Sequence, residues 1–415
     1  MDGNEILLLG IGIQQPWRLV DQRLETDKNP QELHLEVKAD RGSKFPCPNC
    51  GRECSPHDFS KKSWRHLNFF QHHCYVHADV PRVKCSEHGV KQIEVPWARK
   101  GSKFTLLFEQ AAMTLVREMP VSAAARIIGV TDKRLWRVVY HYVAKALAKF
   151  DLSSVKAIGL DETASKRGHN YVTIFIDMEK HKEPVIFATP GKGKGTIKQF
   201  TGFLKSHRGE SKQILEVVCD MSPAFLSGIA EQLPDAEVTV DWFHIVQIFT
   251  RAMDGVRKSE SHVTPLPKYL RWALLKNCNP DQLTVNQLYA LAELLDQGFD
   301  TAIAWRIKER LKWIRQAKTP QAARWRITRF INYARDMIGD SKLLEPMSKA
   351  LDTLTKHAER VVRRWTSTYT NARMEGLNSI FQAARARARG YSDPATFIAM
   401  IYMLASPAGS ILEST

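Results

Sequence analysis

The chain has 415 residues, of which 44% are hydrophobic, so its composition supports packed cores and excludes a disordered or fibrous protein. Its net charge of +16 favours a polyanion, nucleic acid above all, over an anionic membrane surface as the partner. No apolar stretch reaches the length of a membrane span, and the seven cysteines indicate a reducing compartment, the cytoplasm, where clustered cysteines bind metal more often than they form disulfides.

The N-terminal region is expected to cover residues 1–99. Its apolar run at residues 6–13 lacks a basic lead-in and a small-residue cleavage site, so we predict a strand there and no signal peptide. A small zinc ribbon is expected over about residues 44–92, because five of the cysteines fall between Cys47 and Cys85.

Two short motifs define the expected zinc site. Cys47-Pro-Asn-Cys50 is followed by a glycine, which lets the backbone turn its amides toward the thiolates. Cys85-Ser-Glu-His88 repeats the spacing and the glycine, so three cysteines and one histidine are predicted to hold a structural, non-catalytic Zn²⁺. A loose group of reduced, half-buried cysteines is the alternative interpretation. Spare ligand candidates are Cys54, His57, His73 and Cys74.

A helix-turn-helix is predicted within residues 100–152. Residues 104–118 carry apolar side chains at helical spacing, and a short helix, a turn at Gly129 and a second helix capped by Thr131 follow. The second helix enters the major groove in such motifs, and we expect its first residues to contact DNA. An ordinary helical hairpin that acts as a spacer is the alternative. The expected DNA-contacting residues are Lys133, Arg134 and Arg137.

Residues 153–244 change character and are predicted to form the first part of an α/β core. Three strands, a helix, a strand, a helix and a last strand follow one another, in the order of a ribonuclease-H-like domain. In that fold the first and fourth strands are neighbours. The expected strands are residues 155–160, 171–176, 184–188, 214–219 and 237–240, and the expected helices are residues 196–206 and 223–232.

Two aspartates in this core are predicted to share a metal site. Asp161 and Asp220 each follow an apolar run, so we expect both at the ends of neighbouring strands. Like charges at such a distance repel unless a cation lies between them, and oxygen ligands favour Mg²⁺. Taken singly, an aspartate at such a position is more often a helix cap or a turn residue than a metal ligand. Asp241 ends another strand and is either a rival of Asp220 or a support for His244; we expect both outside the direct ligand set.

The remaining chain is predicted to be helical. Residues 245–365 read as a helical insertion whose tryptophans are mainly core and whose basic faces can follow phosphates. Within it one apolar stripe at helical spacing is assigned to core packing, formed by Phe299, Ile303, Ile307, Leu311 and Ile314.

The last segment, residues 366–415, returns to the expected metal site. Glu375 and Asn378 share one helix face, with Asn371 one turn earlier, and Glu375 is the predicted third acid. Alternating arginines follow, and we expect them to bind phosphates as a clamp. A solvated charged helix face is the alternative. The expected clamp residues are Arg385, Arg387 and Arg389.

Together these motifs resemble those of bacterial insertion-sequence transposases that combine a zinc ribbon, a helix-turn-helix and an Asp-Asp-Glu ribonuclease-H-like domain. The resemblance covers essentially the whole chain. Besides the two zinc motifs it rests on Pro96-Trp-Ala-Arg, Leu160-Asp161-Glu162, Cys219-Asp220-Met, Asp241-x-Phe-His244, Asn371-x-x-x-Glu375-Gly-Leu-Asn378 and Ala388-Arg-Gly-Tyr391.

The resemblance implies the reaction. Asp161, Asp220 and Glu375 would hold two Mg²⁺ (or Mn²⁺) ions about 3.5–4 Å apart, which serve phosphodiester hydrolysis and then attack of the freed 3′-hydroxyl on target DNA. The implied partners are double-stranded DNA of the element ends and of the target, and a second copy of the chain in a homodimer or larger assembly. The implied location is the bacterial cytoplasm, in association with the nucleoid.

The sequence therefore predicts a multidomain α/β protein with a zinc ribbon, a helical helix-turn-helix domain and a ribonuclease-H-like core interrupted by an all-helical insertion. Two other functions remain open. One is a DNA-binding regulator with an inactive nuclease-like domain, and the other is a structure-selective nuclease or resolvase that cuts strands but never joins them.

Overall fold

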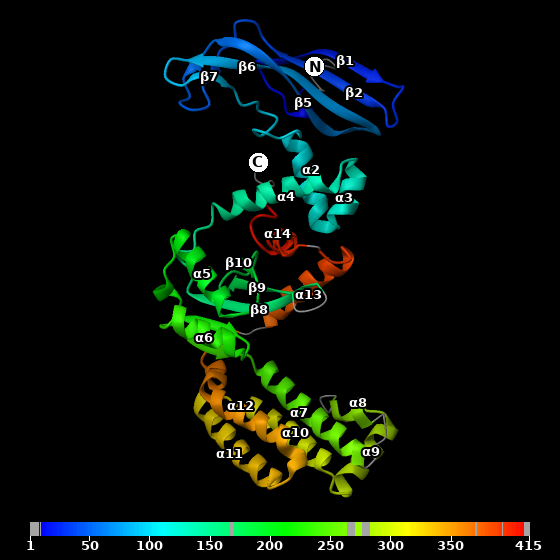
Figure 1. Cartoon of the computed structure of the whole chain (residues 1–415), viewed down its shortest axis with the longest axis vertical. Helices are drawn as coiled ribbons and strands as arrows, with labels where there is room; N and C mark the ends of the chain where they lie inside the picture. Colours follow the sequence, from blue (N-terminus) through cyan, green and yellow to red (C-terminus); the bar gives the residue numbers. More distant parts are fainter. Residues whose placement is uncertain are drawn as a thin grey trace. The chain divides into compact units, whose positions relative to one another are not determined.

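The computed structural model describes residues 8, 10–166, 170–263, 270–275, 283–369, 372–391 and 393–410 (Figure 1). The chain divides into two compact units. Unit 1 comprises residues 1–149, 383–391 and 399–415, and unit 2 comprises residues 150–382 and 392–398.

A five-stranded sheet dominates the start of unit 1. The order is β1-β2-β6-β5 with β7 added to β6, and the β2–β6 pairing is parallel whereas the others are antiparallel. Side chains of β6 alternate between the core and the outer face, with Cys74, Val76 and Ala78 buried. The strands are β1 Trp17–Glu25, β2 Glu32–Ala39, β5 Pro56–Phe69, β6 His72–Cys85 and β7 Gly89–Gln92.

The predicted N-terminal strand is wrong for the residues that the structure describes. Leu8, Gly10 and Ile11 are helical and Gly12 follows in a turn, while Ile11 and Ile13 are buried in the core beneath the sheet. A short, continuous apolar run fits a buried strand and a buried helix equally well, which explains the error.

Three helices complete the first part of unit 1: α2 Leu106–Glu118, α3 Val121–Ile128 and α4 Asp132–Leu147. Thr105 caps α2 by accepting a hydrogen bond from the Phe108 N–H. The turn between α3 and α4 places Gly129 at φ 71°, and a Cβ there would lie 2.7 Å from His73 Nε2. The helix-turn-helix therefore needs glycine at this position, for its backbone conformation and for the approach of β6.

A buried carboxylate fastens α2 to its surroundings. Glu109 is fully buried and accepts hydrogen bonds from Arg99 Nε, Ser102 Oγ and the Tyr142 hydroxyl. A buried charge is tolerated only when it is paired and hydrogen-bonded, as it is here. The segment that begins at Pro96 is thereby joined to both α2 and α4.

Unit 2 is built on a mixed sheet in the order β10-β9-β8-β11-β12. The predicted succession of strands and helices is confirmed, and β8 and β11, the first and fourth strands, are parallel neighbours. Helices α5 and α6 pack on the sheet, where the Phe175 and Phe200 rings stack at 4.5 Å. The elements are β8 Ala157–Lys166, β9 Asn170–Asp177, β10 Val185–Pro190, α5 Lys194–Ser206, β11 Glu216–Cys219, α6 Pro223–Gln232 and β12 Glu237–Val240.

The segment after β12 is helical throughout its described residues (Figure 1). Ile307, Leu311 and Ile314 of the predicted stripe are buried, with Phe299 and Ile303 partly buried against the same core, so the stripe is core packing. Trp305, Trp313 and Trp365 are partly buried, whereas Trp325 is 55% exposed. The helices are α7 Trp242–Val263, α8 Leu270–Leu275, α9 Val285–Asp296, α10 Asp300–Arg315, α11 Pro320–Ile338 and α12 Glu345–Val362.

Two further helices follow, α13 Ala372–Arg387 and α14 Pro394–Ala405. Residues of both helices contribute to unit 1 and to unit 2. Among the helices within the described ranges, none is long and apolar enough to cross a membrane.

Candidate functional site

Three aspartates lie at one level of the unit 2 sheet. The parallel register pairs Val218 with Gly159 across β11 and β8, and Cys219 with Val240 across β11 and β12. Asp220 and Asp241 therefore follow directly after neighbouring strands, and Asp161 lies two residues beyond Gly159.

The prediction that Asp161 ends its strand is wrong. β8 continues to Lys166, and Asp161 pairs with Ile174 of the antiparallel neighbour β9. Only the described parallel pairing with β11 stops earlier, at Gly159. On one side, therefore, the Asp161 backbone is held by pairing with β9. On the other side the pairing of β8 with β11 has already ended.

The electrostatics bring Asp161 and Asp220 into one site. Burial, together with the nearby negative charge of Asp220, raises the pKa of Asp161 to about 6 against the lowering effects of the Glu162 N–H, His244 and Asn378. Burial and Asp220 likewise raise the pKa of Glu162. Asp220 is therefore close enough to repel both neighbouring carboxylates, which favours it over Asp241 as the partner of Asp161.

The two strand-end aspartates also bind local backbone. Asp220 Oδ1 accepts a hydrogen bond from the Ser222 N–H at 2.9 Å, just before α6. Asp241 Oδ1 accepts a longer one, 3.2 Å, from the Phe243 N–H in the first turn of α7. Asp220 thus has the turn-forming role that was its alternative interpretation, and it has this role in addition to its electrostatic effect on Asp161 and Glu162.

Helix α13 is fixed along β8 by two amide side chains. Asn378 Nδ2 donates to Asp161 Oδ2 at 2.7 Å, and Gln382 Nε2 donates to Ala164 O at 3.2 Å and also to Thr163. Asn378 and Gln382 lie one helical turn apart, so α13 runs along the strand with one face against it. This register brings the face predicted from Glu375 and Asn378 to the aspartate.

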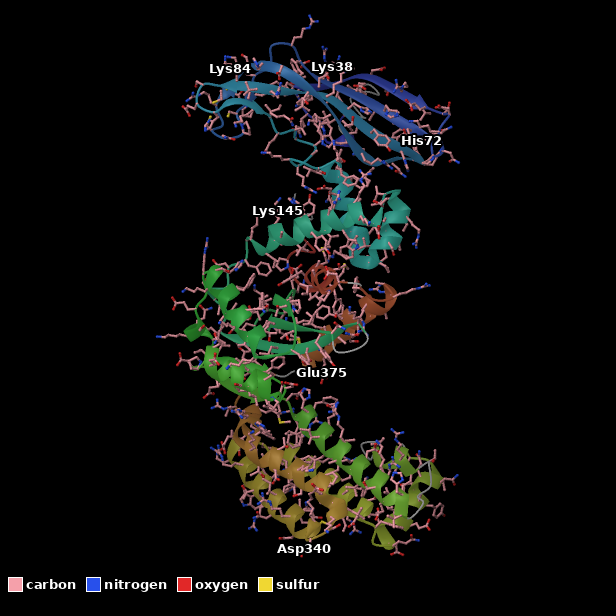
Figure 2. The ribbon with its side chains drawn as sticks, viewed as in Figure 1. Lys38, His72, Lys84, Lys145, Asp340 and Glu375 are labelled. Atoms are coloured by element: carbon pink, nitrogen blue, oxygen red, sulfur yellow. The ribbon has the colours of Figure 1, made fainter. Side chains whose placement is uncertain are left out.

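Glu375 lies on this helix but is exposed. It belongs to the first turn of α13, where Figure 2 labels it beside the sheet of unit 2. Within the described ranges, the ligand atoms of Asp161, Asp220 and Glu375 are not a set that lies within 4.8 Å of one another. Asn371, the other predicted residue of this face, lies outside the described residues.

The residues present fit a divalent cation. Carboxylate and amide oxygens are the ligands that Mg²⁺ prefers, and burial of adjacent carboxylates is costly without a positive charge. Two buried polar atoms beside Asp161 make no hydrogen bond with any described residue, namely Asn378 Oδ1 and His244 Nε2. An amide oxygen and an imidazole nitrogen without hydrogen-bond partners, beside a carboxyl group whose pKa is raised, are features of an ion-binding site.

Glu162 is a functional candidate that the sequence reasoning missed. Its N–H donates to Asp161 Oδ1 at 2.8 Å, so the two oxygens of Asp161 are held by Glu162 and Asn378. Its own carboxylate lies near Asp220 and is partly offset by Lys192. The signal in the sequence was the pair of adjacent acids directly after the apolar first half of the strand.

The four predicted zinc ligands converge in unit 1. The ligand atoms of Cys47, Cys50, Cys85 and His88 all lie within 4.8 Å of one another. Cys50 Sγ and Cys85 Sγ are 3.7 Å apart, and His88 Nδ1 lies 3.6 Å from Cys85 Sγ and 4.0 Å from Cys47 Sγ. Three thiols and one imidazole in this arrangement fit a closed, structural Zn²⁺ site.

The glycines act as predicted at this site. Gly51 and Gly89 have φ of 73° and 68°. The backbone N–H of Glu87, the His88 side chain and the His88 N–H together lower the pKa of Cys85 to about 6. The spare candidates Cys54, His57, His73 and Cys74 lie outside the group of four, which is the only cluster with cysteine among the described residues.

The predicted helix-turn-helix presents part of its expected DNA surface. Lys133 and Arg137 are exposed on α4, and Tyr140 is exposed one turn further along. Arg134 is also exposed, but its guanidinium carbon lies 4.5 Å from the centre of the Phe104 ring. Arg134 therefore joins α4 to the segment before α2 in addition to any contact with DNA.

The alternating arginines after Gln382 have different surroundings. Arg387 Nη1 donates to the Glu118 carbonyl oxygen at 2.9 Å, within unit 1, where the Tyr391 ring lies 6.4 Å from the Trp136 ring of α4. Arg389 follows α13 with a φ of 56°. Of the predicted phosphate clamp (Arg385, Arg387 and Arg389), Arg387 thus already donates a hydrogen bond to a backbone carbonyl.

A basic hollow of about 320 Å³ lies beside the first zinc knuckle in unit 1. Its lining includes Pro48 of the knuckle and the cationic side chains of Lys62, Arg99, Lys100 and Lys103. Arg99 is paired with Glu109, which leaves the three lysines for an external anion. The sequence reasoning missed this surface because Lys62 of β5 is brought next to Lys100 and Lys103 only by the fold.

Known sequences resemble the chain over these same regions. A family profile described as "Transposase" matches residues 158–401, one described as "Helix-turn-helix domain of transposase family ISL3" matches residues 93–143, and one described as "zinc-finger of transposase IS204/IS1001/IS1096/IS1165" matches residues 43–88. The transposase for insertion sequence element IS1557 of Mycobacterium tuberculosis is 27% identical in an alignment of 323 residues that covers 69% of this chain and 70% of that protein. The transposase for insertion sequence element IS1001 of Bordetella parapertussis is 24% identical in an alignment of 365 residues that covers 86% of this chain and 87% of that protein.

Proposed function

The chain belongs to the ISL3 family of transposases, enzymes that cut DNA, and from this premise we propose that it moves a bacterial insertion sequence by binding its terminal inverted repeats. The proposed reaction is Mg²⁺-dependent cleavage at the element ends followed by transfer of the freed 3′ ends to target DNA. The proposed active form is a homodimer or larger assembly on paired ends.

The observation that carries this proposal is the register of β8, β11 and α13. It supports Asp161 and Asp220 as neighbouring ligands, and the bond from Asn378 to Asp161 supports the approach of Glu375 on the same helix. We assign Asp161, Asp220 and Glu375 as the residues that would hold the divalent ions, with Asp241 and His244 in support. When bound, such ions activate water and stabilise the leaving oxygen of a phosphodiester.

The protein's own groups prepare the central carboxylate. The Glu162 N–H and the Asn378 amide each bind one oxygen of Asp161, so its orientation is set before DNA arrives. Burial makes the repulsion between the Asp161 and Asp220 carboxylates costly, and a bound cation would relieve this repulsion.

Unit 1 would supply DNA recognition. We assign Lys133 and Arg137 to groove contact, the lysines of the basic hollow to phosphates, and Cys47, Cys50, Cys85 and His88 to a structural Zn²⁺. The proposed domain boundaries are those expected from the sequence, namely residues 1–99, 100–152, 153–244, 245–365 and 366–415.

The test is an assay of the full-length protein on labelled DNA that carries the element ends, with and without Mg²⁺. The expected products are cut ends and joined strands, both dependent on Mg²⁺ and on the terminal repeats. Cutting without joining, on any branched DNA, would replace the proposal with a structure-selective nuclease. Binding to the ends without cutting would replace it with a regulator.

A further inference from the structure

Two phenylalanines lie exposed at the tip of the β5–β6 hairpin in unit 1. Phe69 ends β5 and pairs with His72, which Figure 2 labels at that end of the sheet, so Phe70 and Gln71 form a two-residue turn. Phe70 is 80% exposed and Phe69 is 42% exposed, and their rings contact each other edge to face at 4.8 Å. Neither the acidic site nor the zinc site uses this tip. We propose that Phe70, supported by Phe69, inserts between base pairs of bound DNA as an aromatic wedge, an inference that rests on the proposed binding of the element ends.

The backbone of the turn is unfavourable for such a side chain. Phe70 has a φ of 53°. Two-residue hairpin turns favour glycine or asparagine at positive φ, because a bulky side chain is strained there. Burial cannot offset this cost in the free protein, since most of the Phe70 side chain remains in water. A strained and exposed aromatic residue is expected to make its contacts with a partner.

The hairpin is joined to the helix-turn-helix at two points. The Thr105 N–H donates to the Arg65 carbonyl oxygen at 3.1 Å, and Thr105 also caps α2. Beyond the turn, the His73 ring lies against Gly129, between α3 and α4, where a Cβ would come within 2.7 Å of His73 Nε2. At about 3.3 Å per residue, Phe70 is within about 10 Å of His73. The tip therefore lies near the turn that precedes the recognition helix α4, where DNA is expected.

The charge of the hairpin fits a polyanion. Residues 59–78, which form most of both strands and the turn, contain three lysines or arginines, four histidines and no aspartate or glutamate. The buried guanidinium of Arg65 donates to two backbone carbonyls and to the Asn68 side-chain oxygen, all of them neutral acceptors. A second copy of this hairpin would carry the same positive charge and be repelled. Duplex DNA instead offers both negative charge and flat aromatic surfaces.

Insertion of the wedge changes the shape of the DNA. An apolar side chain between two base pairs partly unstacks them and kinks the duplex. Pyrimidine–purine steps deform most easily, so the position of the wedge depends on the sequence even without hydrogen bonds to bases. The hairpin therefore reads how easily the DNA deforms, whereas α4 reads base edges.

Unstacking is measured with the fluorescent base analogue 2-aminopurine. Full-length protein without Mg²⁺ is titrated into duplexes of the element ends that carry this base at successive positions, and into random-sequence duplexes of equal length. The wild type should raise the fluorescence at one step, and Phe70→Ala should lose this rise and bind about tenfold more weakly. Phe59→Ala, which changes a 58% exposed phenylalanine of β5 away from the turn, is the matched control and should behave as the wild type. A wild type that unstacks neither duplex, or equal unstacking by Phe70→Ala, would overturn the proposal.

The same titration separates the wedge from the proposed function. Equal unstacking of element-end and random duplexes would support the wedge and remove the preference for terminal repeats. Unstacking by a protein that neither cuts nor joins DNA when Mg²⁺ is added would support the wedge and remove the transposition reaction alone.

Salt dependence and stability distinguish a wedge from an ionic or structural role. Because the contact is apolar, the slope of log affinity against log salt should be equal in the wild type and Phe70→Ala. Phe70→Gly suits the positive φ, so it should be at least as stable as the wild type to denaturant and should still lose unstacking.

Three outcomes would contradict the wedge in these measurements. A smaller salt slope in Phe70→Ala would make the tip a phosphate contact, and a marked loss of stability in Phe70→Gly would make Phe70 a structural residue. A change in the oligomeric state of DNA-free Phe70→Ala would make the tip a contact between two copies of the chain. Each of these results would overturn the proposal.

Discussion

The cysteine cluster of unit 1 and the acidic group of unit 2 differ in how completely the fold assembles them. The four zinc ligands all lie within 4.8 Å of one another, whereas Glu375 is exposed and the described acids form no such set. Thiols and imidazoles can be neutral and so can be brought together at low cost, but carboxylates repel. The fold alone can shape a structural site, while a catalytic site of acids depends on its cation.

Loss of a zinc ligand should have the largest effect, because binding free energy of structural zinc, about 10–16 kcal/mol, is folding free energy. Cys85→Ser should lose the tightly bound Zn²⁺ and expose the amides of the two knuckles to hydrogen exchange. Cys74→Ser, a buried cysteine outside the cluster, should keep both the metal and the protection. If Cys85→Ser kept tight zinc, the fold would not depend on the cluster as this comparison requires.

Loss of an acid should instead remove activity and spare the fold. Asp161→Ala, Asp220→Ala and Glu375→Ala should each lower cleavage by about a thousandfold or more, equivalent to about 4 kcal/mol, with DNA binding and melting temperature retained. Asp241→Ala changes the supporting aspartate after the neighbouring strand and should keep residual activity. The reverse pattern, an active Asp220→Ala and an inactive Asp241→Ala, would exchange their roles.

Asn378 tests whether the helix amide positions the central carboxylate. Asn378→Ala removes the bond to Asp161 and should lower cleavage about tenfold, the loss of one hydrogen bond to a charged group. It should also raise the Mg²⁺ concentration needed for half-maximal rate. Gln382→Ala, one turn along the same helix face, should change the Mg²⁺ requirement far less, and an equal change in both would reduce Asn378 to a helix-packing residue.

The raised pKa of Asp161 predicts a dependence on pH. Its folded pKa, about 6, lies above its ordinary value of 3.8, so the folded protein binds the proton more tightly and loses stability as pH rises through this window. Without divalent metal at pH 7, Asp161→Asn should therefore be more stable than the wild type by about 1–2 kcal/mol. The measurements are denaturant unfolding of the metal-free protein and Mg²⁺ affinity, which should rise from about pH 5 to pH 7 in the wild type alone.

The smallest effect is expected at the basic hollow beside the zinc knuckle. Lys62→Ala should weaken DNA binding severalfold, lower the slope of log affinity against log salt by about one and leave the chemistry unchanged. Lys61→Ala is the matched control, since neighbouring residues of β5 point to opposite faces. Equal salt dependence in both variants would exclude the hollow as a phosphate site.

The sequence was most informative where the pattern is local. The strand and helix order of residues 155–240, the turn at Gly129 and the spacing of the two zinc motifs were all predictable, because apolar runs, a positive φ and ligand spacing act over a few residues. The continuation of β8 past Asp161 was missed because it depends on pairing with β9. Strands between the two zinc motifs were expected, but the pairing of β1 and β2 with them was missed for the same reason.

Contacts between distant segments could not be predicted. The bond from Asn378 to Asp161 joins residues 217 apart, and the ring contact of Arg134 with Phe104 depends on how α4 packs.

The docking of α13 on β8 sets when this protein becomes able to cut DNA as the ribosome makes it. The strand is synthesised 217 residues before the helix amide that binds its aspartate, and the whole helical segment lies between them. Closing so long a loop is slow and comes after local structure has formed. In a nascent or truncated chain the strands and helices of residues 17–147 can therefore form long before Asn378 reaches Asp161.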